Sequence, residues 1–471
     1  MKLVMKFGGT SVADSKCISH VSKIVTEHVK KNHKTVVVVS ALTGVTDKLV
    51  EVCNLAGKGN KDIIPDFLEK LKERHEEAYK NSVQDKNALN KVEEIVEETF
   101  LELKDVLVGI AYLREVTPRI KDYVLSFGER LSTPIVWGAL LSRNVDTQWF
   151  TGKDVGIVTD SNFGSAQPLM EVTTHQVRGK LQGLLEKNVV PVVTGFIAAD
   201  QNGIITTLGR GGSDCTATIL GYALDVDEVW IWTDVDGVMT TDPKIEPNAR
   251  TIQQLSYTEA MEMAYFGAKM VHPGAIELIM KKGIPVRVRN TFKPENPGTL
   301  IVKEQNIEPS SIVKAVSLIR KAALITVSGA SMFGTPGTAA KLFRILGEKN
   351  VNILMISQSS SEANISVVIP REKLEDALST LELFLLDGKI AREIKAEDDI
   401  CVIALVGAGM VGTPGVAAKV FGAVGREKIN VRMIAQGSSE LNISFVVKET
   451  EGEKAVRILH KEFGLDKIGQ P

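Results

Sequence analysis

The sequence predicts an α/β protein with a mainly parallel central sheet, followed by two smaller α/β modules. Three observations carry this prediction. Short Val- and Ile-rich runs alternate with helical segments in the first 300 residues, a charged helical stretch interrupts them, and the last third contains an internal repeat. Alternating strands and helices favour a parallel sheet with ligands at the carboxyl ends of its strands.

The expected strands are short apolar runs that end in turn residues. Strands of a parallel sheet are buried on both faces, so they show no alternation of apolar and polar positions. These runs lie at 3–7, 35–40, 189–194, 228–233 and 284–289. Helices are expected between them at 15–31, 172–186 and 215–224.

Residues 61 to about 122 are predicted to form an inserted group of two or three amphipathic helices. Apolar residues recur there at three-to-four spacing among dense charges. That spacing is typical of helices that bury one face. The charges are interpreted as solvated helix faces rather than as a binding surface.

The C-terminal third repeats itself. GASMFGTPGTAAKLF begins at Gly329 and GAGMVGTPGVAAKVF begins at Gly407, and the match continues into NILMISQSSSEANISVVI and NVRMIAQGSSELNISFVV. Each copy reads strand, glycine-rich loop, helix, strand, loop, strand, which predicts two small modules packed together. The expected division is a catalytic domain at 1–300, a Pro-rich polar linker at 301–311, and modules at 312–395 and 396–471 that are possibly interwoven.

Composition excludes several classes of function. The net charge of −2 gives no general attraction to nucleic acid or to anionic membranes. The four cysteines form no C-x-x-C pair, which argues against a disulfide framework or a zinc site. No apolar stretch resembles a signal peptide or reaches the ~20 residues of a membrane span. A cytoplasmic protein without nucleic-acid or membrane partners is expected.

The first two motifs are KFGGTS and SFGERLS. Adjacent glycines at Gly8 and Gly9 let the backbone approach a phosphate closely, and Lys6 lies two residues before them. The alternative is a plain strand-to-helix turn. In the second motif Glu129 is expected in the first turn of a helix, where the helix dipole alone favours an acid. Its functional interpretation is a carboxylate that accepts from a substrate ammonium.

The third motif, LGRGGSD at 208–214, gives the strongest local signal. Its glycines free backbone N–H groups at a helix start, which suits an anion. Arg210 can hold a carboxylate by two parallel hydrogen bonds, and Asp214 can orient a lysine or a metal-bound water. A glycine loop with an N-cap does not easily explain an arginine, which is expected to be buried among these glycines.

Two further motifs are WTDVDGV, which continues to TDPK, and FGAKMVHP. The acidic run does not follow the EF-hand pattern for calcium, so a nucleotide site at the sheet edge fits better. Lys244 and Lys269 are candidate cations for phosphate, whereas His272 is interpreted as structural. A solvated loop is the alternative for the acidic run.

One motif is interpreted as misleading. Residues 407–412 satisfy G-x-G-x-x-G after a strand, which is a dinucleotide-binding pattern. The first repeat has Ser331 at the middle position, and the module is too short for a full dinucleotide-binding fold. NAD binding is therefore not expected.

Taken together, the five motifs resemble, in order and spacing, the aspartate kinases of the amino-acid kinase superfamily. The resemblance covers nearly the whole chain and includes the paired ACT modules of that family. It implies a three-layer sandwich with a mainly parallel sheet and a helical insertion, plus two βαββαβ-like ACT modules. It also implies transfer of the γ-phosphoryl of Mg-ATP to L-aspartate, in the pathway to lysine, threonine and methionine. The magnesium ion would be carried by ATP rather than held by a protein cluster.

The resemblance assigns roles to individual residues. Lys6, Asp214 and Lys244 would be catalytic. The aspartate would be held by Ser40, Thr46, Glu129, Arg210 and Ser213. The ATP site would consist of Lys6, Gly8, Gly9, Ser11, Thr233, Asp234, Asp242, Lys244 and Lys269. Gln358 and Gln436, at equivalent places in the two repeats, would bind an amino-acid effector, unless they are surface amides at strand ends.

The resemblance also suggests regulation and assembly. The QSSSE context favours threonine over lysine as effector, and exposed ACT strand edges favour a homodimer or homotetramer. The chain leaves no room for the homoserine dehydrogenase domain of some relatives, so one activity is expected. Two alternatives stay open: another amino-acid kinase, acting on glutamate or N-acetylglutamate, and a non-catalytic amino-acid sensor.

Overall fold

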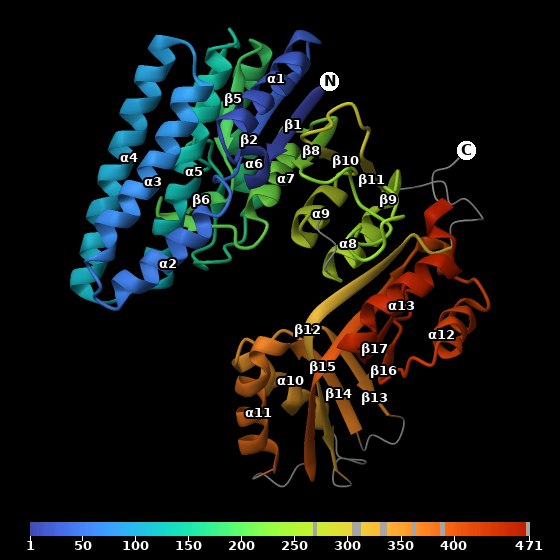
Figure 1. The fold of residues 1–471 in the computed structure, drawn as a ribbon. Coiled ribbons are helices and arrows are strands. Elements are labelled where there is room, and N and C mark those ends of the chain that lie inside the picture. Colours follow the sequence, from blue (N-terminus) through green and yellow to red (C-terminus); the bar gives the residue numbers. More distant parts are fainter. Residues whose placement is uncertain (267–270, 304–311, 330–336, 360–363, 387–390, 468–471) are drawn as a thin grey trace. The chain divides into compact units, whose positions relative to one another are not determined.

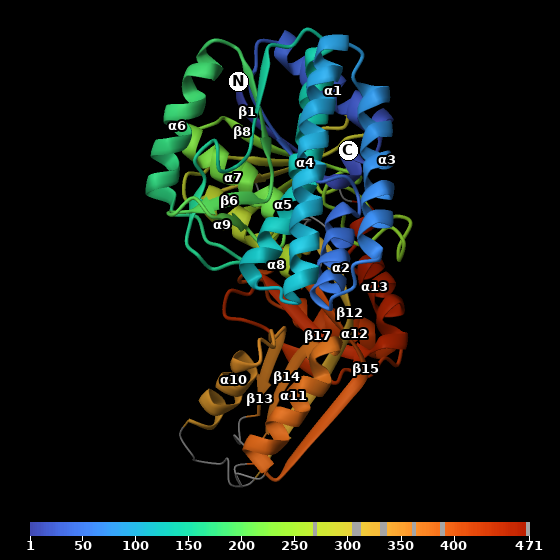
Figure 2. The same ribbon diagram turned by 90° about the vertical axis from the view of Figure 1, so that its left-hand side faces the viewer.

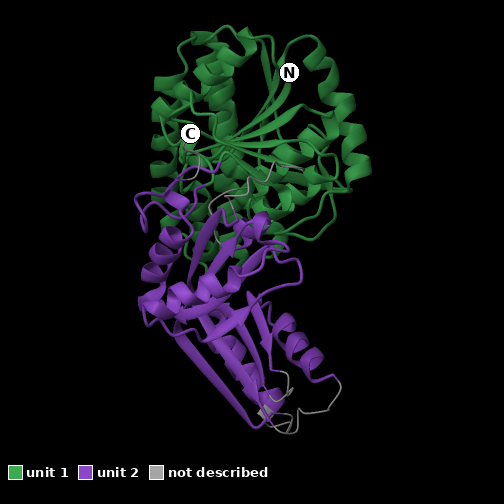
Figure 3. Ribbon diagram, turned by 90° about the vertical axis from the view of Figure 1, so that its right-hand side faces the viewer, with its two compact units in different colours: residues 1–238, 253–261, 270–305 green, residues 239–252, 262–269, 306–471 purple. Residues whose placement is uncertain are grey.

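The computed structural model describes residues 1–266, 271–303, 312–329, 337–359, 364–386 and 391–467. The chain divides into two compact units (Figure 3). The first unit contains residues 1–238, 253–261 and 270–305, and the second contains residues 239–252, 262–269 and 306–471. In the described ranges, no helix is long and apolar enough to cross a membrane.

The first unit is built on an eight-stranded sheet in the order β3-β5-β2-β1-β8-β10-β11-β9. Its strands are β1 (Lys2–Phe7), β2 (Lys34–Val39), β3 (Thr147–Phe150), β5 (Val190–Thr194), β8 (Glu228–Thr233), β9 (Gln254–Ser256), β10 (Val286–Asn290) and β11 (Thr299–Val302). Every pairing in this sheet is parallel except that of β10 with β11. The prediction of a mainly parallel sheet is confirmed.

A second, three-stranded sheet lies in the same unit. It consists of β4 (Val158–Thr159), β6 (Ile197–Asp200) and β7 (Ile205–Thr207), with β6 in the middle. Strands β6 and β7 are antiparallel and form a hairpin. The LGRGGSD motif leaves the end of β7, so this small sheet positions it.

Helices cover the large sheet and form the insertion (Figure 1). They are α1 (Ser15–Lys30), α2 (Val45–Gly57), α3 (Ile63–Ser82), α4 (Lys86–Leu113), α5 (Pro118–Leu141), α6 (Met170–Glu186), α7 (Gly212–Leu224), α8 (Tyr257–Tyr265) and α9 (Pro273–Met280). Figure 2 shows α3 and α4 side by side. Both lie within 61–122, where the amphipathic pattern predicts two or three helices, whereas α2 precedes that range.

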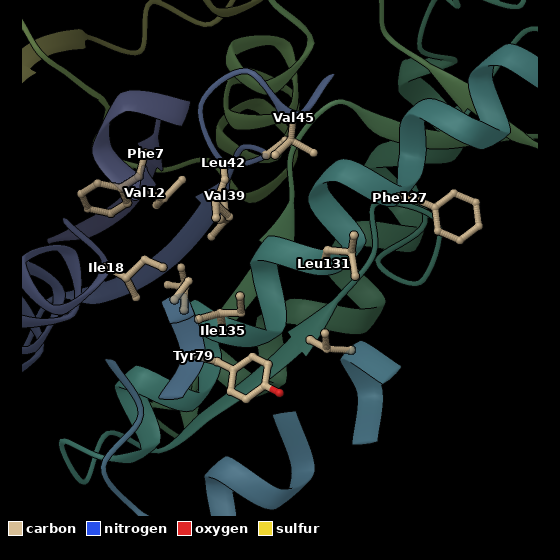
Figure 4. Packing of buried hydrophobic residues seen from close by; sticks show 14 of the residues in the cluster. Phe7, Val12, Ile18, Val39, Leu42, Val45, Tyr79, Phe127, Leu131 and Ile135 are labelled. Atoms are coloured by element: carbon tan, nitrogen blue, oxygen red, sulfur yellow. The ribbon is translucent and has the colours of Figure 1, made fainter. Parts of the chain in front are cut away.

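The main core lies between the sheet and helices α1 to α5. Leu3, Met5 and Phe7 of β1 join it, together with Tyr79 of the insertion (Figure 4). Val4 points to the opposite face and is also fully buried. Burial of β1 on both faces places Lys6 and the glycines after it at the end of a rigid strand.

The second unit is a six-stranded antiparallel sheet in the order β13-β14-β12-β15-β17-β16. Its strands are β12 (Ala315–Ser328), β13 (Met355–Gln358), β14 (Asn364–Pro370), β15 (Glu393–Val406), β16 (Met433–Ala435) and β17 (Asn442–Lys448). Its helices are α10 (Thr338–Glu348), α11 (Leu374–Leu381), α12 (Val416–Arg426) and α13 (Glu449–Glu462). The two repeats therefore have the same order of elements.

The two repeats exchange halves of their long strands. In β12, Val316 packs with Phe445 of the second repeat, whereas Ile325 packs with Leu342 of the first. The pairing of β12 with β15 shifts register near Lys321, which has a φ of 56°. The modules are interwoven through these two strands.

Candidate active site

A cavity of about 850 Å³ opens at the carboxyl ends of the parallel strands of the first unit. Predicted residues of several motifs line it together: Lys6, Gly9, Ser40, Thr46, Glu129, Arg210, Ser213 and Asp214. They come from the ends of β1, β2 and β7 and from helices α2, α5 and α7. The fold thus brings one group of predicted side chains, far apart in sequence, to one place.

Lys6 and Asp214 form an ion pair at the wall of this cavity. Lys6 Nζ lies 2.7 Å from Asp214 Oδ1, and both side chains are about nine-tenths buried. This distance is typical of a charged contact between an ammonium and a carboxylate. Asp214 therefore holds the lysine ammonium at the end of β1, and because the ammonium has three N–H donors, the others can serve a ligand.

The two glycines after β1 keep the backbone close to its neighbours. Gly8 N donates to Trp232 O at 3.2 Å. A Cβ at Gly9 would lie 3.0 Å from the carbonyl oxygen of Ala41, the residue after Ser40. A side chain at Gly9 would press on the segment after β2, so this glycine keeps that end of the cavity narrow.

Glu129 is buried in the middle of a helix rather than in its first turn. Helix α5 begins at Pro118, where Ile120 N donates to the Thr117 hydroxyl at 3.2 Å. The prediction that SFGERLS opens a helix was wrong, because the Thr117–Pro118 start signal precedes it by more than two turns. The helix dipole thus does not explain Glu129, and its burial needs another reason.

The carboxylate of Glu129 is only half satisfied. Ala41 N donates to Glu129 Oε1 at 3.1 Å, while Glu129 Oε2 has no partner among the described residues. Burial raises the pKa of Glu129 to about 8, although the Ala41 N–H and the nearby Lys6 charge oppose that shift. A buried carboxylate oxygen without a donor at a cavity wall suits a cationic ligand group.

The loop after β7 presents Arg210 to the cavity. Gly209 and Gly211 on either side have φ values of 71° and 72°, a region that favours glycine. Arg210 is exposed and makes no hydrogen bond or ion pair with any residue in the described ranges. The expectation that it is buried among the glycines was wrong, because those glycines form an outward turn.

Contacts with neighbouring elements position the remaining residues predicted to bind the substrate. The Ser132 hydroxyl donates to Ser40 O at 2.8 Å, which ties the segment after β2 to α5. A Cβ at Gly195 would lie 2.5 Å from Ser213 Oγ, so only glycine fits under the start of α7. Thr46 belongs to α2 and lines the same cavity.

Other predicted residues do not line this cavity. The Ser11 hydroxyl is buried and lies 2.6 Å from the Thr291 hydroxyl. Thr233 donates through its hydroxyl to Asp234 at 3.1 Å, on the strand next to β1. Their roles, with that of Gly8, stay predictions.

The remaining ATP candidates lie elsewhere in the chain. Asp242 and Lys244 belong to the segment 239–252 of the second unit, where Lys244 N donates to Asp242 Oδ1 at 2.9 Å. Lys269 lies outside the described residues. The roles of these three residues also stay predictions.

Sequence reasoning missed two residues around the cavity. Asp122 and Phe196 line it, and Phe196 has a φ of 66°, a strained value for a large side chain. Asp122 is one charge among many in its segment, and Phe196 shows no local pattern, so only the fold reveals them. His272, interpreted from the sequence as structural, packs against the loop, since a Cβ at Gly211 would lie 2.4 Å from its Cβ.

In the second unit, the two glutamines occupy equivalent places at the sheet edges. Gln358 ends β13, and Gln436 follows β16. Ile356 and Ile434, two residues before each glutamine, are about half exposed on these edge strands. Residues 360–363 of the QSSSE context lie outside the described ranges.

Comparison with known proteins assigns both units. Residues 1–290 match the model of the amino acid kinase family, and residues 325–383 and 403–463 match that of the ACT domain. The chain belongs to the amino acid kinase family. Within this family it is an aspartokinase relative, and it is a phosphotransferase.

Several matches cover almost the whole chain. Aspartokinase 1, chloroplastic, of Arabidopsis thaliana is 33% identical over 98% of this chain and 80% of its own. The structure of E. coli aspartokinase III in complex with aspartate and ADP superposes with a TM-score of 0.83 at 30% identity, covering 98% of this chain and 99% of that one. The same enzyme in complex with lysine and aspartate gives a TM-score of 0.80 at 31% identity, with the same coverage of both chains. The predicted kinase fold with ACT modules is confirmed.

Proposed function

We propose that the protein transfers the γ-phosphoryl group of ATP to the side-chain carboxylate of L-aspartate, giving ADP and 4-phospho-L-aspartate. The observation that carries the proposal is one cavity lined by a buried carboxylate with an unpartnered oxygen, an exposed guanidinium and a lysine ammonium. A small molecule with one ammonium and two carboxylates complements these charges. The E. coli relative with 0.83 TM-score is described in complex with aspartate and ADP, which supports this assignment.

Glu129 and Arg210 are proposed to hold the backbone groups of aspartate. Glu129 Oε2 accepts from the α-ammonium, and Arg210 donates two parallel hydrogen bonds to the α-carboxylate. Ser40, Thr46 and Ser213 supply neutral hydrogen-bonding groups. Fixing the two groups on the α-carbon orients the side-chain carboxylate of the substrate for in-line attack.

Lys6 is proposed to stabilise the transferring phosphoryl group. The nucleophile has a pKa of about 3.9 in free solution and is ionised at pH 7, so it needs no general base. The barrier comes from repulsion between two anions. The Lys6 ammonium, held by Asp214, the N–H group of Gly9, and the Mg²⁺ carried by ATP offset that repulsion. Ser11, Thr233, Asp234, Asp242, Lys244 and Lys269 complete the proposed nucleotide site.

The experiment is Mg-ATP-dependent acyl phosphate formation, trapped with hydroxylamine, from aspartate, glutamate and N-acetylglutamate. Product from aspartate is expected, and N-acetylglutamate is expected to fail because it has no ammonium for Glu129. Product from N-acetylglutamate alone would keep the phosphoryl chemistry and overturn the role of Glu129, whereas product from glutamate alone would overturn the choice of aspartate as substrate. Turnover of none of the three would favour the non-catalytic sensor.

Regulation is proposed to act through Gln358 and Gln436, with threonine as the effector. The equivalent places of the two glutamines in the two repeats and the QSSSE context support this proposal. Lysine is the alternative effector, because the structure of an E. coli relative is a complex with lysine. Adding each amino acid to the assay separates them. Inhibition by threonine that Gln358→Ala removes is expected, and inhibition by lysine alone would contradict the choice.

Assembly into a homodimer or homotetramer through the ACT edge strands is also proposed. The half-exposed Ile356 and Ile434 on those strands support it. Sedimentation with and without the effector tests it, and a monomer under both conditions would contradict it. The expected place of action is the cytoplasm, at the first step toward lysine, threonine and methionine.

A further inference from the structure

Asp122, on the first turns of α5, is buried at the wall of the cavity and accepts three hydrogen bonds. Asp122 Oδ2 accepts from Gly164 N and from Thr207 N, each at 2.9 Å, and Asp122 Oδ1 accepts from the Thr207 hydroxyl at 2.8 Å. Its side chain is 1% exposed. A carboxylate that accepts several N–H and O–H bonds fixes the groups that donate to it.

These bonds connect the two elements that carry the proposed partners of the substrate ammonium and α-carboxylate. On one side, Asp122 and Glu129 lie seven residues apart, about two turns on one face of α5. On the other side, Thr207 ends β7 three residues before Arg210. The bonds of Asp122 therefore hold the helix with Glu129 against the strand that leads to Arg210.

Gly164 extends the same connection to the glycine loop. A Cβ at Gly209 would lie 3.1 Å from Gly164 O, so the two backbone segments are in direct contact. Ala166 N donates to Thr207 O at 3.0 Å, which joins the segment that contains Gly164 to the end of β7. Asp122 thus supports Arg210 along two routes, through Thr207 and through Gly164.

We propose that Asp122 is a positioning residue that holds Glu129 and Arg210 in place in the cavity they share with Lys6, and thereby selects the amino diacid whose side-chain carboxylate has the right length to reach the Lys6 end. The inference rests on the proposed function, in which these two groups hold the ammonium and the α-carboxylate. A shift of either group by about 1 Å moves the side-chain carboxylate away from the in-line position. Asp122 contacts no substrate atom in this account and acts through the two elements it joins.

The chain contains a matched control for Asp122. Asp200, 5% exposed, accepts from Asn202 N and Ile204 N at 2.9 Å and from the Ser161 hydroxyl at 3.0 Å. It has the same number and kinds of donor, but it does not line the cavity. Its loss measures the purely structural effect of removing such a carboxylate.

The experiment compares Asp122→Ala with Asp200→Ala by steady-state kinetics and thermal unfolding. Asp122→Ala is expected to raise KM for aspartate about tenfold, leave KM for ATP within about twofold, and lower the preference for aspartate over glutamate. Asp200→Ala is expected to lower Tm comparably without changing either KM. Asp122→Asn, which keeps an acceptor for the backbone N–H groups, is expected to restore most of the aspartate affinity.

Two results would overturn the inference. One is an aspartate KM in Asp122→Ala no higher than in Asp200→Ala, and the other is an equal rise in KM for ATP. If Asp122→Ala does not fold, Thr207→Val removes one of the three bonds, and an aspartate KM unchanged from the wild type would overturn it equally. Failure of the wild type to phosphorylate aspartate is a different outcome, which removes the proposed function itself.

Discussion

Two connections in this chain are both rich in glycine and lead into a helix, but they have different surroundings. The loop 208–211 leads into α7, and the loop 407–415 leads into α12. The glycine just before each helix, Gly211 or Gly415, has a positive φ, 72° and 86° respectively, and neither helix has a side-chain cap. The glycines set the same kind of backbone turn at both places.

The two loops differ in the acceptors of their backbone N–H groups and in the charged side chains nearby. In the second loop, Gly407 N donates to Leu441 O at 3.0 Å, and Gly412 N donates to Glu440 Oε2 at 2.6 Å. A protein carboxylate thus already occupies an N–H group of this loop that an anion would need. The first loop faces a cavity with Lys6 and Asp214. Glycines permit an anion site, and the surrounding charges decide whether it exists.

The largest expected effect comes from the charge of Lys6. Lys6→Met is expected to lower kcat by about 10²–10³-fold while changing KM for ATP much less, because the charge stabilises the transition state more than the bound substrate. Lys2→Met is the matched control on the same strand, since Lys2 Nζ donates to Leu224 O outside the cavity. A normal kcat in Lys6→Met would remove Lys6 from the catalytic group.

The two loops are compared directly by Gly211→Ala and Gly412→Ala. Both glycines have positive φ, 72° and 66°, so each alanine costs about 1–2 kcal/mol of backbone strain. At Gly211 the new Cβ would also lie 2.4 Å from the Cβ of His272, whereas at Gly412 no atom lies within 4 Å. Gly211→Ala is expected to lower kcat/KM at least tenfold, and Gly412→Ala is expected to leave it unchanged. Equal losses would show that the loops do not differ in function.

The smallest expected effect is on the free energy of unfolding, and it has opposite signs for Glu129→Gln and Glu440→Gln. The pKa of Glu129 is about 8 in the folded chain against an ordinary 4.5, so the folded state keeps a proton that the unfolded state has lost. Stability from this group is therefore full below pH 4.5 and is lost as pH rises to about 8. Glu129→Gln is expected to be more stable than the wild type by on the order of 1–3 kcal/mol at pH 8.5, and equally stable at pH 4.

Glu440→Gln is the counterpart in the second loop. Glu440 is exposed and paired with the Gly412 N–H, so its replacement is expected to lower stability by no more than about 0.5 kcal/mol at either pH. Denaturant unfolding of both variants at the two pH values measures the difference. A destabilised Glu129→Gln at pH 8.5 would mean that the carboxylate is satisfied in the folded chain.

Much of the fold follows from the sequence. The Val- and Ile-rich runs became strands because burial on both faces needs no alternation, as β1 and β2 show. The repeat predicted the same order of elements in both ACT modules. The exchange of strand halves was left open, because a change of partner in mid-strand near Lys321 leaves the apolar pattern intact.

The site was less predictable than the fold. The motifs single out Lys6, Glu129 and Arg210, and the structure places all three at one cavity, while their roles stay predictions. The start of α5 and the exposure of Arg210 were predicted wrongly, because the local Thr117–Pro118 start signal was not used and the glycines on either side of Arg210 turn it outward. Asp122 was missed because it depends on tertiary contacts, since its donors lie 42 and 85 residues away.

The central claim is that Glu129 binds the ammonium of aspartate, and proton release on binding tests it most directly. Since the pKa of Glu129 is about 8, the free enzyme holds this proton at pH 7, and a bound ammonium must displace it. Calorimetric titration of aspartate at pH 7, in buffers of different ionisation enthalpy, is expected to show roughly one proton released per aspartate bound, and none with Glu129→Gln. Wild-type binding without proton release, or equal release by the variant, would contradict the account.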